Sequence, residues 1–430
     1  MLMPDDTETP EYPGVEVTPA AADDAERVSA FPRSRVGAFG PPSAPAFDLR
    51  TLSLTTAAHF LNDIHYAFLA PLLPLVVAKF NLTLTLAGLL ASILNASSAI
   101  SQPVFGAFAD QMRRRVFVVL GPTLTVAAMG LVGLAPSYEV LVVLLLIAGT
   151  GTSSFHPQGA STAGYASGPR QGTGLSLFVA GGELGYALGP LWIALVVSAW
   201  GLGATWMAAL PGLIACALLW GAVRPQPTAH AVREHRLRAD LRRVVRPLGM
   251  LWLLVAMRSV IILTFTTFLP LLLRERGGTL LAGGAAVFFF GGVGAIGGLL
   301  GGSLSDRLGR RAVLVLSLVT GTPLLYAFLH TQGPWSFALL AAGGVAYYLT
   351  AAVTIVMAQQ ILPHRASVAS SIVMGLAWGT AGLALTGVGA LADAVSLQTA
   401  MTYVLGLALP ALALVSVLPM SATPPVQRAR

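Results

Sequence analysis

The chain has 430 residues, of which 55% are hydrophobic and only 10% are charged, and its mean hydropathy is +0.75. Soluble domains carry about 25% charged residues, so this composition excludes a water-soluble enzyme or a free nucleic-acid-binding protein. The net charge of +7 comes from arginines that stand in short clusters between long apolar stretches, which is the pattern of a membrane protein.

The chain begins with an acidic segment rich in Pro and Ala, which holds nine of the 18 acidic residues. It lacks the charged and apolar regions of a signal peptide, so we expect a disordered cytoplasmic tail. From residue 51 on, apolar segments long enough to cross about 30 Å of hydrocarbon alternate with short polar breaks. Twelve such spans are expected, at about 52–78, 85–109, 115–134, 138–164, 172–198, 204–222, 248–272, 281–304, 312–329, 335–361, 367–390 and 397–418.

The longest internal break, residues 223–247, holds seven arginines and divides the spans into six plus six. The predicted fold is therefore an all-α membrane protein of two six-helix bundles. The expected parts are a tail (1–50), an N-terminal bundle (51–222), a basic cytoplasmic linker (223–247), a C-terminal bundle (248–418) and a cytoplasmic tail (419–430).

The loop arginines predict the orientation, because cytoplasmic loops carry an excess of Lys and Arg. If both termini are cytoplasmic, 21 basic residues lie inside and three lie outside, namely Lys79, Arg274 and Arg276. Arg258 alone falls within a span. We therefore expect a multi-pass monomer in a bacterial inner membrane, with the lipid bilayer as its surroundings and no nucleic-acid partner.

A short pattern occurs twice, about 196 residues apart: a Gly, three residues, an Asp and then an arginine cluster. Both copies follow the second span of a six-span half, so they indicate an internal repeat. One interpretation is ordinary cytoplasmic loop charge with a capping Asp. The repetition favours a gate in which Asp and Arg pair across the helix ends. The predicted gating residues are Asp110, Arg113 and Arg114 in the first copy, and Asp306, Arg307, Arg310 and Arg311 in the second.

These two segments resemble the loop motif of the major facilitator superfamily, and the resemblance covers about residues 51–418. Three further segments resemble the fosmidomycin-resistance group of that superfamily: His59-Phe60-Leu61-Asn62-Asp63, the run from Gly149 to Pro157, and the run from Gly181 to Leu191. The resemblance implies an inner-membrane drug exporter driven by proton influx. Glu183 departs from the group, which often has an amide at this position, and this leaves the substrate open.

Ionisable groups within spans are costly and mark functional sites. In the first span His59, Asn62, Asp63 and Tyr66 share one helical face by their spacing. At about 1.5 Å per residue, Asp63, Glu183, Arg258 and His156 all lie near the middle of their spans. Substrate and coupling-ion sites of such transporters are expected in that layer.

The predicted proton-coupling residues are Asp63, Glu183, His59 and His156, with Asp63 as the carrier and the histidines as partners or relays. The predicted substrate-binding residues are Asn62, Tyr66, Arg258, Tyr347 and Thr354, with Arg258 attracting an anionic group or pairing with a carboxylate. Gly181, Gly185, Gly189 and Pro190 form a small-residue stripe for close helix packing, and resemble the Gly-Pro segment of superfamily antiporters. In the alternative interpretation, the buried charges only hold the two halves together.

Three functions remain open at this stage: a proton-coupled exporter of a small drug-like or anionic compound, a symporter importing a metabolite such as an organic anion or sugar, and a non-transporting receptor. The resemblance of the fifth span favours the exporter. No nucleophile–base pair, no metal-ligand set and no ATP-binding loop is visible, so we expect no enzyme, no metal and no cofactor, with a proton gradient as the energy source.

Overall fold

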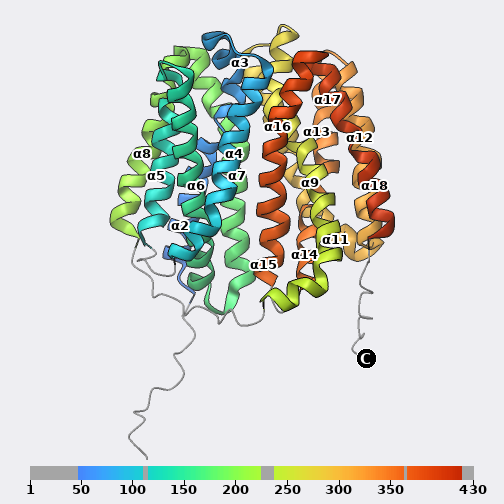
Figure 1. Ribbon diagram of the computed structural model, residues 1–430. Helices are drawn as coiled ribbons and strands as arrows, with labels where there is room; N and C mark the ends of the chain where they lie inside the picture. Colours follow the sequence, from blue (N-terminus) through green and yellow to red (C-terminus); the bar gives the residue numbers. More distant parts are fainter. Residues whose placement is uncertain (1–46, 110–114, 224–236, 363–365, 419–430) are drawn as a thin grey trace, which may run out of the picture. The chain divides into compact units, whose positions relative to one another are not determined.

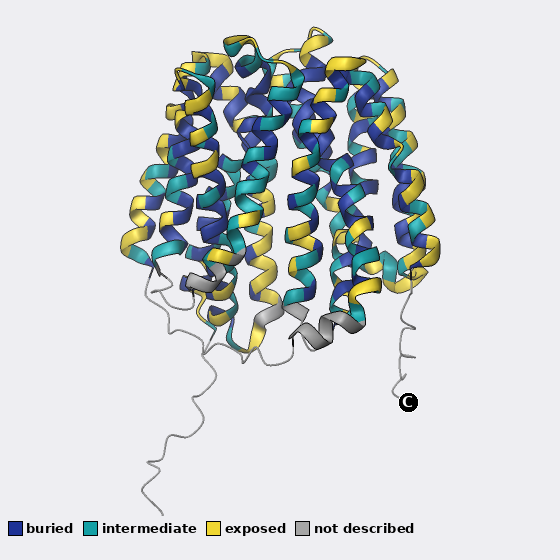
Figure 2. Cartoon of the chain, viewed as in Figure 1, coloured by how far each residue is buried: buried dark blue, intermediate teal, exposed yellow. Residues whose placement is uncertain are grey.

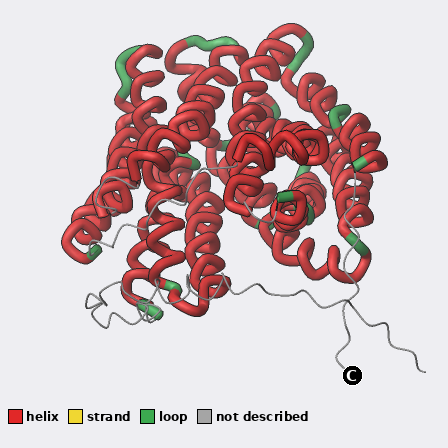
Figure 3. The backbone as a smooth tube through the Cα atoms, turned by 60° about the horizontal axis from the view of Figure 1, so that its bottom comes forward, coloured by secondary structure: helices red, strands yellow, loops and turns green. Residues whose placement is uncertain are grey.

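The computed structural model describes residues 47–109, 115–223, 237–362 and 366–418, all within one compact unit, Pro45–Arg430. Every regular element in these ranges is helical, as the predicted all-α fold requires (Figure 3). The described residues contain twelve segments long and apolar enough to cross a membrane, one for each predicted span. The predicted gate residues Asp110, Arg113 and Arg114 lie outside the described residues, as do residues 1–46 of the predicted N-terminal tail and the whole predicted C-terminal tail, 419–430.

The first half of the chain forms spans one to six (Figure 1). Its elements are α2 (Leu49–Tyr66), α3 (Leu69–Phe80), α4 (Leu84–Ala109), α5 (Arg115–Leu131), η3 (Val132–Leu134), α6 (Tyr138–Ala166), η4 (Gly168–Arg170), α7 (Gln171–Trp200), η5 (Leu202–Ala204) and α8 (Thr205–Ala222). Side-chain caps start several of these helices. The Asp48 carboxylate accepts from the Thr51 N–H at the start of α2, and Ser137 caps α6 in the same way.

The second half forms spans seven to twelve. Its elements are α9 (Leu237–Glu275), α10 (Leu280–Val287), η6 (Phe288–Gly292), α11 (Ala295–Leu308), α12 (Arg310–His330), α13 (Pro334–Tyr348), α14 (Ala351–Ile361), α15 (Ala366–Ser371), η8 (Ile372–Leu376), α16 (Ala377–Ala394), α17 (Leu397–Leu405) and α18 (Ala408–Val417). Helix α9 begins inside the predicted linker 223–247, so the linker's last residues are already helical.

Several spans are interrupted along their length. The first span breaks at Ala67 and Phe68, where Pro71 has no N–H to donate to the carbonyl four residues earlier. The tenth span breaks at Leu349 and Thr350. The eighth and eleventh spans each contain a π-helical turn, η6 and η8, and such turns occur frequently at functional sites.

Burial follows the expectation for a membrane-spanning bundle. Figure 2 shows that buried positions (dark blue) and exposed positions (yellow) alternate along the helices. The exposed side chains include large apolar ones, such as Leu299, Leu218 and Leu409, which would be unfavourable in water but suit a lipid environment.

The bundle has two ends, which we name by residues in their loops. The end that carries Asn81 and Gly333 is the Asn81 end, and the opposite end, which carries Gly309, is the Gly309 end. All three cations predicted to lie outside are at the Asn81 end. Two of them, Lys79 and Arg276, cap the ends of neighbouring spans. The acceptors are the carbonyl oxygens of Gly133 (3.0 Å) and Ala135 (2.6 Å) for Lys79, and those of Leu329 and Thr331 (3.5 Å) for Arg276.

These two clamps are equivalent in the internal repeat. Each acceptor of Arg276 follows an acceptor of Lys79 by 196 residues, the separation between the two Gly-Asp-Arg motifs. The repeat read from the sequence is therefore present in the three-dimensional arrangement of the helices. Each clamp ties the first span of its half to the third span by satisfying carbonyl groups that a helix end leaves free.

The two halves pack along two equivalent seams, and α3 also packs on α9 and α10. In the first, α4 lies beside α16 (Figure 1), and in the second α7 packs on α10 and η6. A Cβ added at Gly88 of α4 would overlap the Leu385 carbonyl, and one at Gly284 of α10 would overlap the Pro190 carbonyl. Glycine therefore brings the backbones into contact in both seams, and the two glycines are again 196 residues apart.

Candidate functional site

The polar face predicted for the first span forms a compact group in α2. The Asp63 carboxylate accepts a hydrogen bond from the Asn62 side-chain amide (2.8 Å, Oδ1) and lies 3.2 Å from Nε2 of His59 through its other oxygen. His59 precedes Asp63 by one helical turn, and this i, i+4 spacing places both side chains on one face. The Asp63 side chain is 15% exposed, so the group is largely shielded.

The fourth span contributes His156, whose Nε2 lies 3.3 Å from Oδ1 of Asp63. On its other side, Nδ1 of His156 lies 3.4 Å from the Gln102 side-chain amide nitrogen of α4. The structure thus brings together three of the four residues predicted for proton coupling, namely His59, Asp63 and His156. Asn62, which was predicted to bind substrate, joins the same group. A further bond runs from Thr152 of α6 to the Asn62 amide oxygen (3.3 Å), and holds the amide with its nitrogen toward Asp63.

The fifth span positions His59. Nδ1 of His59 lies 2.8 Å from the Phe178 carbonyl oxygen, and the Phe178 ring stacks on the imidazole with centroids 4.2 Å apart. Gly182, one turn further along α7, leaves room for the same ring, because a Cβ there would overlap it. The His59 ring is therefore held between a stacked aromatic ring and a glycine, with both of its nitrogens committed.

The hydrogen positions in this group follow from its acceptors. A carbonyl oxygen only accepts, so Nδ1 of His59 must donate to Phe178. In a neutral His59, Nε2 would then present a lone pair to Oδ2 of Asp63 at 3.2 Å, and two acceptors at that distance repel. The contact is satisfied only when a proton lies between Nε2 and Oδ2. The site therefore contains a defined position for one titrating proton.

The same three residues could also surround a small metal cation. One ligand atom from each of His59, Asp63 and His156 lies within 4.8 Å of the others. Two imidazoles and one carboxylate suit a divalent transition metal, but the contacts described above are equally satisfied by protons alone.

Glu183, the remaining predicted coupling residue, follows Gly182 on α7. It lies within electrostatic range of Asp63 and His59 and is not hydrogen-bonded to any described residue. Tyr186, one turn along α7, interacts electrostatically with both carboxylates. Tyr348 of the second half lies within electrostatic range of Glu183, Tyr186 and Arg258.

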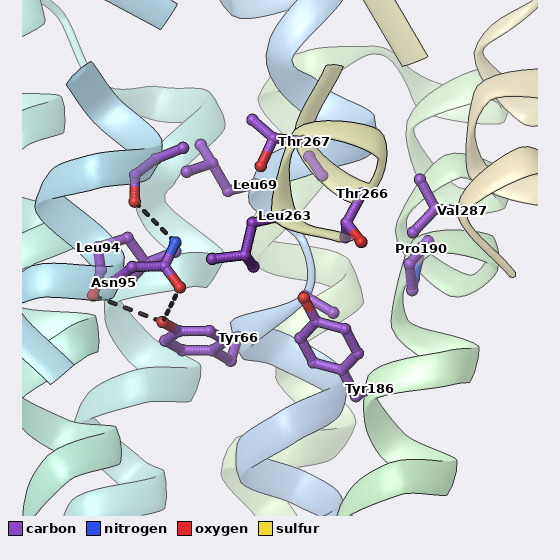
Figure 4. A pocket seen from close by; sticks show the side chains of 13 residues that line it. Tyr66, Leu69, Leu94, Asn95, Tyr186, Pro190, Leu263, Thr266, Thr267 and Val287 are labelled. Carbon is purple, nitrogen blue, oxygen red and sulfur yellow. Dashed lines mark hydrogen bonds between the residues drawn. The ribbon is translucent and has the colours of Figure 1, made fainter. Parts of the chain in front are cut away.

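A pocket lies one helical turn from Asp63, toward the Asn81 end (Figure 4). Both halves line it: Tyr66 and Asn95 come from the first half with Tyr186, and Thr266 and Thr267 come from α9. The Tyr66 hydroxyl lies 3.5 Å from both the Leu94 carbonyl and the Asn95 side chain. The cavity volume is about 30 Å³, which is room for about two water molecules and too small for a substrate.

Arg258 is buried on α9, with 4% of its surface exposed. Its guanidinium donates to the Tyr347 carbonyl, at the point where the tenth span breaks, while its Nε has no partner among the described residues. No described carboxylate pairs with it. Arg258 therefore stabilises the end of α13, as a cation at a helix C-terminus does, and retains an unused donor.

Of the five predicted substrate residues, only Tyr66 lines this pocket; Asn62, Arg258, Tyr347 and Thr354 do not. The Tyr347 side chain is fully buried, and its hydroxyl lies 2.9 Å from that of Thr322 on α12. The Thr354 hydroxyl bonds to the carbonyls of Thr350 and Ala351 within its own helix. Neither residue lines the pocket with Tyr66, so their role in substrate binding stays a prediction.

The second predicted gate is only partly paired. Arg310 donates to the Gln360 side chain, and Arg311 donates to the Leu418 carbonyl at the end of α18 (2.9 Å). Asp306 and Arg307 are exposed and form no ion pair with any described residue. The hydrogen bonds of the described part of the predicted gate therefore stay within its own half.

The predicted glycine stripe of α7 faces α2. A Cβ at Gly181, Gly185 or Gly189 would meet the backbone of Thr56, Phe60 or Ile64, respectively. The stripe therefore packs the fifth span on the first, inside one half. Pro190 lies at the other seam, where its carbonyl contacts α10, and it also lines the pocket.

Three site residues were not predicted from the sequence. Phe178 acts through its backbone carbonyl, which residue identity does not reveal. The other two had a sequence signal: Gln102 lies on the same face of α4 as Asn95 and Ser98, and Tyr186 lies one turn from Glu183 on α7.

Comparison with known proteins agrees with this arrangement. The chain's match to the family profile of the Major Facilitator Superfamily covers residues 55–387. The fosmidomycin resistance protein of Escherichia coli strain K12 is 26% identical over 385 residues, which cover 86% of this chain and 93% of that protein. The uncharacterised transporter YfnC of Bacillus subtilis strain 168 is 30% identical over 357 residues, which cover 80% of this chain and 86% of that one.

The fold is also found among solved structures. A bacterial homologue of the human lysosomal transporter Spinster, in an inward-facing and occupied conformation, has a TM-score of 0.75 at 16% identity, covering 87% of this chain and 97% of that chain. The family profile matches well over half of the chain, and the expected resemblance is confirmed. With its twelve spans and its buried polar centre, the chain belongs to the Major Facilitator Superfamily of membrane transporters.

Proposed function

We propose that the protein is a proton-coupled exporter of a small drug-like or anionic compound, which works by alternating access in a bacterial inner membrane. The observation that carries the proposal is the contact between His59 and Asp63. Their facing atoms, 3.2 Å apart, require a proton between them, and the group lies one helical turn from a pocket that both halves line.

The arginine distribution supports an orientation with the Gly309 end in the cytoplasm, since 21 basic residues belong to that side. In this orientation the two seams close the outer side. The proton enters the His59–Asp63 position from outside when the seams open, and leaves to the cytoplasm when they close. Glu183, which has no hydrogen-bonding partner among the described residues, is the second carboxylate that can take up a proton or bind the substrate.

The environment of Arg258 supports the proposal that the substrate is anionic. Arg258 is the one buried Lys or Arg side chain within the described spans, and its Nε donor is unused. An anionic group, such as a phosphonate, would satisfy this donor better than any neutral group. The similarity to a fosmidomycin resistance protein agrees with this substrate class and makes fosmidomycin the first compound to test.

A symporter that imports a metabolite is the second candidate, because the same proton position could couple to movement in either direction. The two functions differ in one measurable respect. An exporter moves protons inward as substrate leaves, whereas a symporter moves both in the same direction. The similarity to a drug-resistance protein favours export.

The test uses the purified protein in liposomes that contain a pH-sensitive dye, with fosmidomycin as the probe. We expect a substrate gradient to drive proton movement in the opposite direction. Asp63→Asn should abolish this coupled movement, and Glu183→Gln should weaken it. Glu139→Gln is the matched control, because Glu139 is an exposed carboxylate in the first turn of α6, remote from the site.

Two outcomes would refute the proposal. Full coupling in both the Asp63→Asn and Glu183→Gln proteins would remove the assigned proton carriers. Proton and substrate movement in the same direction would replace the exporter by the symporter. In cells, an exporter-deficient bacterial host expressing the chain should tolerate more fosmidomycin, and an uncoupler should remove this tolerance.

A further inference from the structure

The seam between α4 and α16 contains a carboxylate in an unusual position. Asp393, near the end of α16, accepts hydrogen bonds from the backbone N–H groups of Leu84 and Thr85, both at 2.8 Å, and from the Thr85 hydroxyl at 2.5 Å. Leu84 is the first residue of α4. A residue from the second half of the chain therefore caps a helix of the first half.

This contact satisfies groups that the helix itself cannot satisfy. The first N–H groups of an α-helix have no partner within the helix, and the helix dipole makes this end favourable for an anion. Thr83 caps α4 locally by accepting from the Leu86 N–H (3.2 Å), so Asp393 takes the donors that remain. Hydrogen bonds from N–H to a carboxylate are stronger than neutral ones.

The same seam contains a second polar contact, about two turns deeper in the bundle. The Ser92 hydroxyl donates to the Gly382 carbonyl and accepts from the Thr386 N–H, at 2.8 and 3.1 Å. The other seam has no counterpart among the described residues. There, Gly284 and Pro190 bring α10 and α7 together through backbone contact, and no hydrogen bond joins the two helices. The polar contacts thus belong to one of two otherwise equivalent seams.

We infer that Asp393 is a latch that holds the Asn81 end closed, by binding the start of α4 only while α4 and α16 are in contact. The bonds join the two halves, so any opening of this seam must break them. The latch therefore sets the ratio between the state closed at the Asn81 end and the state open there. This inference rests on the alternating-access cycle of the proposed function, but not on its proton coupling.

The test measures distances between spin labels across the Asn81 end. Labels are placed at Leu134 and Trp335, exposed residues of opposite halves at this end, in a Cys216→Ala background reconstituted in lipid nanodiscs. The protein with Asp393 intact should show one short distance between the two labels. Asp393→Asn, which removes the charge, should raise the population of a longer distance about tenfold.

Thr85→Val is the second variant, because it removes only the hydroxyl bond, and it should shift the distances in the same direction by less. Glu139→Gln removes a carboxylate from the start of a helix at the same end, but within its own helix, and should change nothing. Unchanged distances in Thr85→Val and in every correctly folded Asp393 variant would overturn the latch. An equal shift in Glu139→Gln would also overturn it.

A second label pair separates this inference from the proposed function. Tyr165 and Leu308 are exposed residues of opposite halves near the Gly309 end. If Asp393→Asn opens the Asn81 end while the Gly309 end closes, the latch and alternating access both stand. If the Asn81 end opens without closure at the other end, the latch stands and the alternating-access cycle is contradicted.

Discussion

Asn62 and Arg258 occupy equivalent positions in the two halves of the chain, 196 residues apart on the first and seventh spans. Pro74 and Pro270, later in the same two spans, have the same separation. Asn62 donates to the carboxylate of Asp63, whereas Arg258 donates to the Tyr347 carbonyl. At this position of the repeat, the side chain of the first half donates to a carboxylate and that of the second half donates to a helix-end carbonyl. The carboxylates and the buried arginine therefore lie in opposite halves.

The glycine beside His59 should be sensitive to the smallest substitution. In Gly182→Ala the added methyl group overlaps the imidazole ring, so His59 must move away from Asp63. Misplacing a reacting group by about 1 Å costs about 100-fold in rate, and we expect substrate-driven proton movement in liposomes to fall by about 10- to 100-fold. Gly221→Ala is the control, because no atom lies near its Cβ. Wild-type coupling in Gly182→Ala would argue against a role for the His59–Asp63 contact.

Two substitutions of Arg258 should separate its structural role from its electrostatic role. Arg258→Gln keeps an N–H donor for the Tyr347 carbonyl but loses the charge, whereas Arg258→Met loses both. We expect Arg258→Met to lower the free energy of unfolding by about 1–3 kcal/mol, because a buried carbonyl is left without a donor. Thermal unfolding in detergent measures this effect. Transport of an anionic compound should be lost in both variants, and retention in Arg258→Gln would exclude an anion site.

The two clamps at the Asn81 end should contribute similarly to stability. Lys79→Met and Arg276→Met each remove hydrogen bonds to two helix-end carbonyls, and we expect each to lower the free energy of unfolding by about 1 kcal/mol. Arg274→Met should have little effect, since its one bond is long, at 3.5 Å, and exposed. Melting temperatures of the purified variants test this, and an equal loss for all three would show a general charge effect instead.

Close backbone contact in the first seam should be needed for closure at the Asn81 end. In Gly88→Ala the added methyl group overlaps the Leu385 carbonyl, so α4 is pushed away from α16. A cysteine introduced at Thr267, which lines the pocket, should then react faster with a membrane-impermeant maleimide. Gly387→Ala on α16 meets no neighbouring atom and should react at the original rate. Equal rates in both variants would contradict a closing role for Gly88.

The spans and the polar face of the first span could be predicted from the sequence because both depend on local pattern. Apolar length defines a span, and the i, i+3, i+4 spacing of His59, Asn62 and Asp63 places them together whatever surrounds the helix. The breaks were harder to predict. The interruption before Pro71 has a sequence cause, but the π-helical turn η6 contains no proline and arises where the eighth span packs on α7.

The partners of the site residues could not be predicted, because they depend on which helices become neighbours. His156 was expected near Asp63 from its depth alone, and the contact with Asp63 depends on the packing of α6 against α2. The bond of Arg258 to a carbonyl that is free only because the tenth span breaks could not be predicted, and its attraction of an anion stays a prediction. Every residue has a backbone carbonyl, so the residue type does not show which carbonyl accepts such a bond.

The paired clamps of Lys79 and Arg276 have a mechanical consequence. Each clamp holds the ends of the first and third spans of one half together, so it opposes sliding of these two spans and favours their tilting together. Movement is then directed to the contacts between the halves, including the bonds of Asp393, and to the interruptions within the spans. A protein built in this way can rock about its centre while both halves keep their internal shape.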